Sequence, residues 1–270
     1  IWTEFKHEAD YSPVAYIGEW KKGKPGIAHP DVPKPYRVIK ELDGWNMAGG
    51  PIDGSYGPLI NLEGVKVDGK QVRWAYGPQR QGRDFKYVDD NNRDLTPDEI
   101  NAEWAEKRLL ELANSDDENP FFMAVGFLRP HTPLIVPQKY FDMYPLESIK
   151  LANILENDKD DTFLHLVDQF ETKGRRVRSI EMYKNLVASY DDNKEGLKRF
   201  TQAYLACVTA VDENIGQVLD AVNKTKLKEN TIVIIASDHG WTMGEKEHIY
   251  KNSLWEESTR VPLIIRAPGV

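Results

Sequence analysis

The chain has 270 residues, of which 40% are hydrophobic, with a formal net charge of −8 at pH 7 and a pI near 5.4. This length and composition suffice for one sizeable α/β domain. The negative charge disfavours nucleic acid and anionic membrane surfaces as partners, although an anionic substrate can still bind where the local field is positive. No apolar run approaches the ~20 residues that span a bilayer.

The N-terminal third carries few signals of regular structure. Residues 1–95 are rich in Trp, Tyr, Pro and Gly and are predicted to form a loop-rich segment. Turn clusters lie at Gly49-Gly50-Pro51, Asp53-Gly54 and Asp68-Gly69. A hairpin is predicted across Gly64–Tyr76.

A helix, a strand and a proline-rich turn are predicted next. Thr96-Pro97-Asp98-Glu99 has the spacing of a capping box with Pro at the first helical position, so a helix is expected to run to about Ala113. Phe121–Val125 is predicted to be a strand. Two prolines stiffen the turn Arg129-Pro130-His131-Thr132-Pro133, which presents His131. That histidine is either functional or a turn residue bonded to backbone.

A polar segment and a long helix follow. Residues 146–196 are charge-dense and are interpreted as an insertion over the rim of the functional pocket, not as a separate domain. A helix is predicted from about Gly196 to Val222, because its apolar residues recur with a helical period. Cys207 borders this apolar stripe and is interpreted as a small buried hydrophobe. The stripe consists of Phe200, Tyr204, Val208, Val211, Ile215, Val218 and Val222.

The most informative segment is an apolar run that ends in an acid and an imidazole. Thr231–Ala236 is nearly continuous Ile and Val, which predicts a strand buried on both faces. Open α/β sheets place their chemistry past the carboxyl ends of such strands, so Asp238 and His239 are expected where a metal or an anion can bind. The alternative is a simple turn with Gly240 at a positive φ. Val261–Arg266 is predicted to be a further strand, in one largely parallel sheet with the other two.

Three segments together carry a resemblance to a known family. They are Pro120–Pro133, Tyr204–Leu219 and Ser237–Gly269, and in this order they resemble the sulfatase family of the alkaline phosphatase superfamily, above all its iduronate-2-sulfatase branch. The resemblance implies an α/β fold with an alkaline-phosphatase-like, mostly parallel sheet flanked by helices, incomplete at its N- and C-terminal ends. It also implies that residues 1–270 are part of a single sulfatase catalytic domain.

The resemblance implies a metal site. Asp238 and His239 are expected to be ligands of a divalent cation, and calcium is the usual metal of the family. Asp238 supplies the oxygen ligand that a hard cation prefers, whereas His239 suits such a cation less well. Magnesium and manganese stay open as alternatives.

The resemblance also implies an anion site. His131 and Lys251 are expected to contact the sulfate or ester oxygen, and one of them to protonate the leaving alcohol. Substrate contacts are implied for Arg129, His248 and Trp241. Packing is the alternative for Trp241, and a plain surface position is the alternative for Lys251.

The nucleophile of the family is not in this sequence. Sulfatases use a formylglycine made from a Cys or Ser in Cys/Ser-x-Pro/Ala-x-Arg, and neither this motif nor the early Asp-Asp metal pair occurs here. We therefore expect a fragment of a longer protein, inactive alone, with the formylglycine in a missing upstream segment. By resemblance, the parent would be periplasmic, secreted or lysosomal.

Three functions remain open at this stage. The first is a sulfuric ester hydrolase that acts on a sulfated carbohydrate or another small sulfate ester. The second is a phosphatase or phosphonate monoester hydrolase of the same superfamily. The third is a non-catalytic, carbohydrate-binding fragment.

Overall fold

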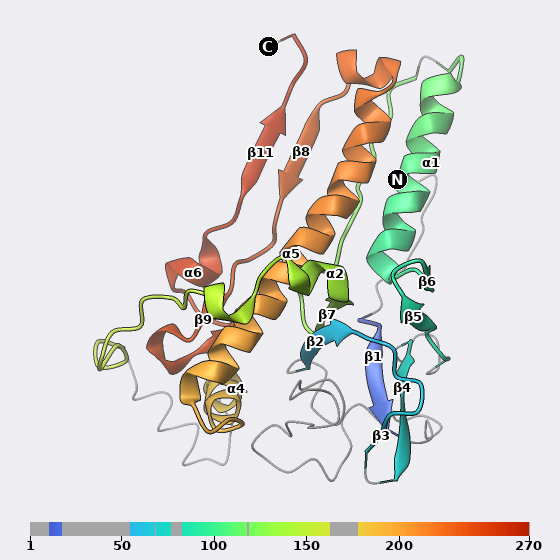
Figure 1. The fold of residues 1–270 in the computed structure, drawn as a ribbon. Helices are drawn as coiled ribbons and strands as arrows, with labels where there is room; N and C mark the ends of the chain where they lie inside the picture. Colours follow the sequence, from blue (N-terminus) through green and yellow to red (C-terminus); the bar gives the residue numbers. More distant parts are fainter. Residues whose placement is uncertain are drawn as a thin grey trace.

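The computed structural model describes residues 11–17, 55–67, 69–76, 83–117, 119–162 and 178–269. Two helices dominate this mixed α/β structure and pack side by side, α1 (Pro97–Asn114) and α5 (Asn193–Asn223) (Figure 1). The shorter helices and 3-10 turns are α2 (Gln138–Asp142), η4 (Leu146–Ser148), α4 (Arg178–Val187), η5 (Lys226–Glu229), η6 (Glu245–Glu247) and α6 (Glu256–Thr259). The strands are β1 (Val14–Ile17), β2 (Tyr56–Leu59), β3 (Lys66–Val67), β4 (Lys70–Ala75), β5 (Tyr87–Asp89), β6 (Asn92–Arg93), β7 (Leu134–Pro137), β8 (Val233–Ala236), β9 (Thr242–Met243), β10 (Ile249–Tyr250) and β11 (Leu263–Arg266).

The capping box predicted for α1 is present. Thr96 Oγ1 accepts the Glu99 N–H at 3.4 Å, while the Glu99 carboxylate accepts the Thr96 N–H at 2.7 Å. Arg93 also donates to that carboxylate at 2.7 Å. These contacts satisfy N–H groups that a helix start leaves without partners. The predicted helix is therefore confirmed, and it extends one residue past Ala113.

The long helix α5 is confirmed, but its buried face is rotated from the predicted stripe. Phe200 of the stripe is buried as predicted, but Ala203 and Cys207 are the almost inaccessible residues further along, whereas Val208 of the stripe is 39% exposed. The small residues on the buried side let α1, β7 and α2 approach closely, and this contact decides which side is covered. The interpretation of Cys207 as a buried hydrophobe is confirmed. Among the described helices, none has the length and apolarity that a membrane span requires.

The core of the molecule is built on a parallel pair of short strands. β2 and β7 pair in parallel, with Tyr56 opposite Leu134, and both strands are fully buried. α5 packs over this pair, and Phe200 meets Tyr56 edge-on at 5.6 Å between ring centroids. β7 begins directly after the proline-rich turn, so the core fixes the position of His131.

The predicted arrangement of the later strands needs correction. β8 and β11 form the expected pair but run antiparallel, with Ala236 opposite Leu263 (Figure 1). β8 is not buried on both faces, since Ile234 is 62% exposed, and every residue of β11 is exposed. The physical reason is that no element of the described chain covers the outer face of this two-stranded ribbon.

The predicted strand at Phe121–Val125 is also wrong for this structure. The segment has no strand partner, and Phe122 is 79% exposed. It is held instead beside α1, where Asn101 donates to the Gly126 carbonyl at 3.1 Å. A single parallel sheet that contains all three predicted strands is therefore absent from the described residues.

The described parts of residues 1–95 and 146–196 contain more regular structure than the sequence predicts. The described parts of residues 1–95 contain six short strands, and β3 and β4 form the hairpin expected across Gly64–Tyr76. Two of the predicted turn clusters, at Gly49-Gly50-Pro51 and Asp53-Gly54, lie outside the described residues. Within residues 146–196, α4 was not anticipated, and its Met182 and Leu186 are buried in the core.

Candidate functional site

The turn that carries His131 is held from both sides. Asp98, in the first turn of α1, accepts the backbone N–H groups of Leu128 at 2.7 Å and Arg129 at 2.9 Å. The His131 N–H then donates to the Leu128 carbonyl at 2.8 Å. Because Asp98 is buried and β7 follows the turn, the backbone around His131 is fixed by α1 and by the core.

The His131 ring lies among aromatic and cationic side chains. Tyr11 and Trp241 contact it, with ring centroids 5.1 and 6.4 Å away. Burial lowers the pKa of His131, the hydrogen bond with the Thr132 carbonyl opposes this effect, and the nearby charges of Lys251 and Arg129 lower the pKa by smaller amounts. The two cationic residues predicted for the anion site are therefore within electrostatic reach of the His131 ring.

The tautomer of His131 follows from its hydrogen bond. Nδ1 lies 2.7 Å from the Thr132 carbonyl oxygen, which can only accept, so Nδ1 carries the proton. The lowered pKa keeps the ring neutral near pH 7. Nε2 therefore presents a lone pair and not an N–H.

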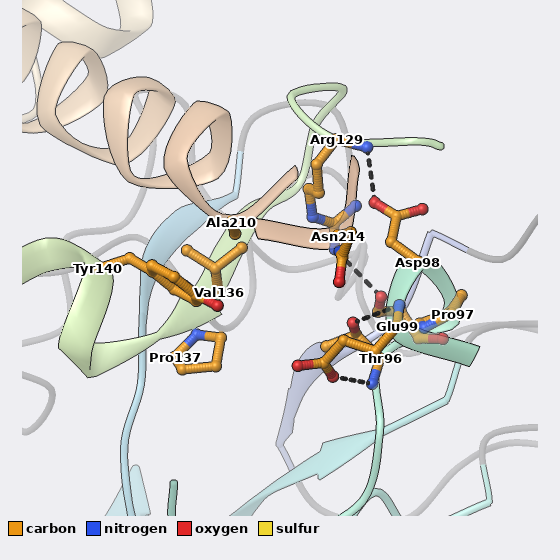
Figure 2. A pocket seen from close by; sticks show the side chains of 11 residues that line it. Thr96, Pro97, Asp98, Glu99, Arg129, Val136, Pro137, Tyr140, Ala210 and Asn214 are labelled. Carbon is orange, nitrogen blue, oxygen red and sulfur yellow. Dashed lines mark hydrogen bonds between the residues drawn. The ribbon is translucent and has the colours of Figure 1, made fainter. Parts of the chain in front are cut away.

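Arg129 points into the interior. Its side chain is buried, and Nη2 donates to the Ser12 carbonyl at 3.0 Å. Figure 2 shows it at the wall of a hollow around the start of α1, where the Asp98 carboxylate faces its backbone N–H. Of the seven predicted site residues, only Arg129 lines this hollow, so the hollow lies beside the His131 cluster. The lining residues are Ser12, Thr96, Pro97, Asp98, Glu99, Arg129, Val136, Pro137, Tyr140, Ala210 and Asn214.

Asp238 and His239 follow the end of β8, and their side chains lie close together. Asp238 Oδ2 lies 3.4 Å from His239 Nε2, and the Asp238 side chain is 84% exposed. His239 Nδ1 lies 2.8 Å from the Gly240 carbonyl and must donate to it, so Nε2 of the neutral ring carries a lone pair. A carboxylate oxygen and an imidazole lone pair at this spacing suit a cation between them.

These two donors do not complete a metal site. Within the described residues, no group of three or more His, Cys, Asp or Glu side chains could hold a metal ion. Calcium takes 6–8 oxygen ligands, and Asp238 supplies the only carboxylate of the predicted pair. The donor chemistry therefore fits part of a metal site, and further ligands are needed.

Trp241 is a packing residue in this structure. It is 8% exposed and meets Tyr250 and Tyr204 at 5.0 and 6.2 Å between ring centroids. Its backbone N–H donates to the Glu257 carbonyl at 2.8 Å. The neighbouring Gly240 N–H donates to the Ser258 carbonyl, also at 2.8 Å. A methyl group on Gly240 would collide with the Glu257 carbonyl oxygen, so only glycine permits this close approach.

His248 is likewise buried. Its Nδ1 lies 2.7 Å from Thr242 Oγ1, and that hydroxyl donates its single proton to the Tyr250 carbonyl, also at 2.7 Å. His248 therefore donates from Nδ1. Burial lowers its pKa to about 4, and Trp255 covers it edge-on at 5.1 Å. This placement favours support of the loop over contact with a substrate.

Lys251 follows a backbone of unusual conformation. Tyr250 has a φ of 118°, a value rare for a residue with a side chain, and Lys251 Nζ lies 5.7 Å from the Tyr250 ring centroid. The structure brings Lys251, Arg129 and His239 into electrostatic reach of His131 and places Asp238 against His239.

Sequence reasoning missed two residues of this arrangement. Asp98 was visible only as an acid in the first turn of a helix, and nothing in the sequence linked it to the turn 30 positions later. Tyr11 lies in a segment with no recognisable pattern, so its contact with His131 had no signal.

The chain is similar to known proteins of one family. The sulfatase family model matches residues 71–270. A sulfatase of Formosa agariphila is 39% identical over 176 residues, covering 65% of this chain and 32% of that protein. Iduronate 2-sulfatase of Mus musculus is 34% identical over 174 residues, covering 64% of this chain and 31% of that protein. A solved phosphonate monoester hydrolase from Silicibacter pomeroyi is 26% identical and has a TM-score of 0.46, covering 61% of this chain and 33% of that one.

The chain thus spans about a third of the length of these relatives. The family match itself extends over well more than half of the 270 residues, and it includes the proline-rich turn, the long helix and the segment from Asp238 to Lys251. The chain belongs to the sulfatase family.

Proposed function

We propose that the protein of which this chain is part is a sulfuric ester hydrolase that acts on a sulfated carbohydrate. The observation that carries the proposal is that the cationic side chains of Lys251 and Arg129 both act electrostatically on His131, in the turn held by α1 and the core. Positive groups preorganised in a partly desolvated site stabilise an anion and the charge that develops on it. The similarity to a mouse iduronate 2-sulfatase supports a carbohydrate as the substrate.

We assign the proton donor to Lys251. Cleavage of a sulfate ester leaves negative charge on the departing oxygen, which a positioned acid can protonate. The neutral His131 ring uses its only N–H for the Thr132 carbonyl, so it has no proton to offer from Nε2. A lysine ammonium has three N–H donors and can both bind the ester oxygen and protonate it.

The metal is proposed only in part. Members of the sulfatase family use a metal ion and a formylglycine, and Asp238 and His239 are the donors that this chain would contribute to the ion, for which calcium is our proposal. When bound, the ion would hold a sulfate oxygen and stabilise its charge. We place the remaining ligands and the formylglycine outside these 270 residues. By family resemblance, we also propose a periplasmic, secreted or lysosomal location.

The test is turnover by the gene product that contains this chain, matured to carry formylglycine. Sulfate release from a 2-sulfated uronic acid is measured beside phosphate release from an aryl phosphate. Lys251→Ala is expected to lower sulfate release by about 10²–10⁴-fold. The matched control is Lys228→Ala, which removes an exposed lysine whose Nζ lies 3.5 Å from the carboxylate of its neighbour Glu229.

Each other outcome points elsewhere. Preferential release of phosphate would replace the proposal with a phosphatase or phosphonate monoester hydrolase. Release of neither product by a correctly matured protein would leave a carbohydrate-binding role. A Lys251→Ala variant as active as the Lys228→Ala control would remove Lys251 from the mechanism.

A further inference from the structure

The turn between β9 and β10 has a backbone that few sequences adopt. Gly244 has a φ of 114°, and Lys246 and Glu247 are both left-handed, with φ values of 57° and 55°. Consecutive left-handed residues with side chains are rare, and such conformations persist only where the surroundings impose them. Some other part of the molecule must therefore hold this turn.

The holder is the acidic turn at residues 157–161. Asp158 accepts the Lys246 backbone N–H at 2.8 Å, and the Lys246 ammonium donates to the Asp158 carboxylate at 2.9 Å and to its carbonyl at 2.7 Å. The same ammonium reaches Asp161 at 2.8 Å. We call these contacts the 158–246 clamp.

A second pair repeats the clamp with the charges exchanged. Lys159 Nζ donates to Glu247 Oε1 at 2.8 Å. Asp158 and Lys159 on one turn therefore face Lys246 and Glu247 on the other, each opposite a residue of opposite charge. This order specifies one register between the two turns, because a shift by one residue would oppose like charges. Below the charges, Ile154 packs against Gly244, where an added methyl group would lie 2.9 Å from its Cδ1.

The clamped turn leads directly to Lys251. The Gly244 N–H donates to the His248 carbonyl, and the His248 N–H to the Glu245 carbonyl, each at 3.0 Å. Thr242 then ties β9 to the Tyr250 carbonyl, the last group before Lys251. A change in the turn is therefore passed through a short, hydrogen-bonded hairpin to the proposed proton donor.

We propose that Lys246 and Asp158 are positioning residues. The 158–246 clamp holds the Gly244–Tyr250 turn in its left-handed conformation and thereby fixes Lys251 beside His131. The role of Lys251 rests on the proposed function, whereas the effect of the clamp on the turn does not. An isolated surface ion pair contributes little to stability. The clamp differs from such a pair because it also binds the Lys246 backbone N–H and the Asp158 backbone carbonyl.

The test has an arm that needs no activity. Hydrogen exchange is followed across residues 244–251 of the 270-residue chain for Lys246→Ala and the milder Lys246→Gln. Each is expected to raise exchange there by about tenfold or more while the melting temperature changes little. Lys224→Ala is the matched control, because it removes an exposed lysine that pairs with Asp220 on α5. Exchange like that of the control in both variants would overturn the clamp.

The second arm measures positioning in the matured gene product. Lys246→Ala is expected to lower kcat for sulfate release by about 10- to 100-fold with KM nearly unchanged. Lys246→Arg, which keeps a cationic donor for the Asp158 carboxylate, is expected to retain part of the activity that Lys246→Ala loses. An unchanged kcat, or a loss in KM alone, would overturn the positioning role. If the wild-type product releases no sulfate at all, the proposed function fails, and the exchange arm still decides the clamp.

Discussion

Trp241 meets His131 edge-on, with ring centroids 6.4 Å apart and an interplanar angle of 76°. The two residues are 110 positions apart in the sequence, and they come from the two segments that carry most of the family resemblance. Their contact joins the proline-rich turn to the segment after β8. The Trp241 ring therefore links the two halves of the candidate site directly.

Trp241→Ala is expected to destabilise the chain by about 3–5 kcal/mol, because it leaves a cavity among the rings of His131, Tyr204 and Tyr250. Trp241→Phe should cost clearly less, since the buried indole N–H has no hydrogen-bond partner among the described residues and its loss leaves no new polar group unpaired. Urea unfolding measures both. Leu254→Ala, at a 95% exposed side chain, is the control. A Phe variant as unstable as the Ala variant would contradict this account.

Asp98→Ala is expected to cost about 2–4 kcal/mol, because two backbone N–H groups lose their acceptor in a buried place. Asp98→Asn keeps one acceptor oxygen, so its loss in unfolding free energy should be about half that of Asp98→Ala. The measurement is thermal or denaturant unfolding, with hydrogen exchange at Leu128 and Arg129 to locate the effect. Loss of stability without faster exchange at these two amides would place the role of Asp98 elsewhere in α1.

His248 makes stability depend on pH. Its folded pKa of about 4 is below the ordinary value of 6.5, so the unfolded chain binds more protons between these values. The stabilisation from neutral His248 is complete above pH 6.5 and is lost as the pH falls towards 4, by about 3 kcal/mol in all. His248→Asn keeps an N–H donor near Nδ1 but does not titrate. The wild type minus variant difference in unfolding free energy should follow this window, and a constant difference would disprove it.

Two glycines provide a matched pair of alanine substitutions. Gly240→Ala places a methyl group against the Glu257 carbonyl and should destabilise the chain by about 1–3 kcal/mol. Gly216→Ala, inside α5 with nothing within 4 Å, should stabilise it by about 0.5–1 kcal/mol. Melting temperatures measured side by side give the sign of each change. A Gly240→Ala variant as stable as the Gly216→Ala variant would show that the contact with α6 does not constrain residue 240.

Local signals predicted the local structure well. The capping box at Thr96, the hairpin after Gly64 and the helix over Cys207 each depend on residues close in sequence, and each is confirmed. The predicted burial failed where it depended on distant partners. Ile234 was expected inside a sheet, and it is exposed because no described strand or helix covers it.

The candidate site shows the same division. Resemblance and spacing brought His131, Lys251 and Asp238 forward, and the structure places the first two within electrostatic reach of each other. The sequence could not reveal that Asp158 holds Lys246, because charged residues are frequent and their pairing across 88 positions has no sequence pattern. Burial of Trp241 and His248 also depends on the packed neighbours of each ring, which periodicity does not describe.

The antiparallel pairing of β8 and β11 has a practical consequence for probes of this protein. Arg266 lies opposite Val233, at the start of β8, whereas Asp238 follows the other end of that strand. A fluorophore or surface tether attached after Gly269 would therefore point away from Asp238 and His239 (Figure 1). Immobilisation through that position leaves the end of β8 next to Asp238 and His239 accessible to ligands from solution.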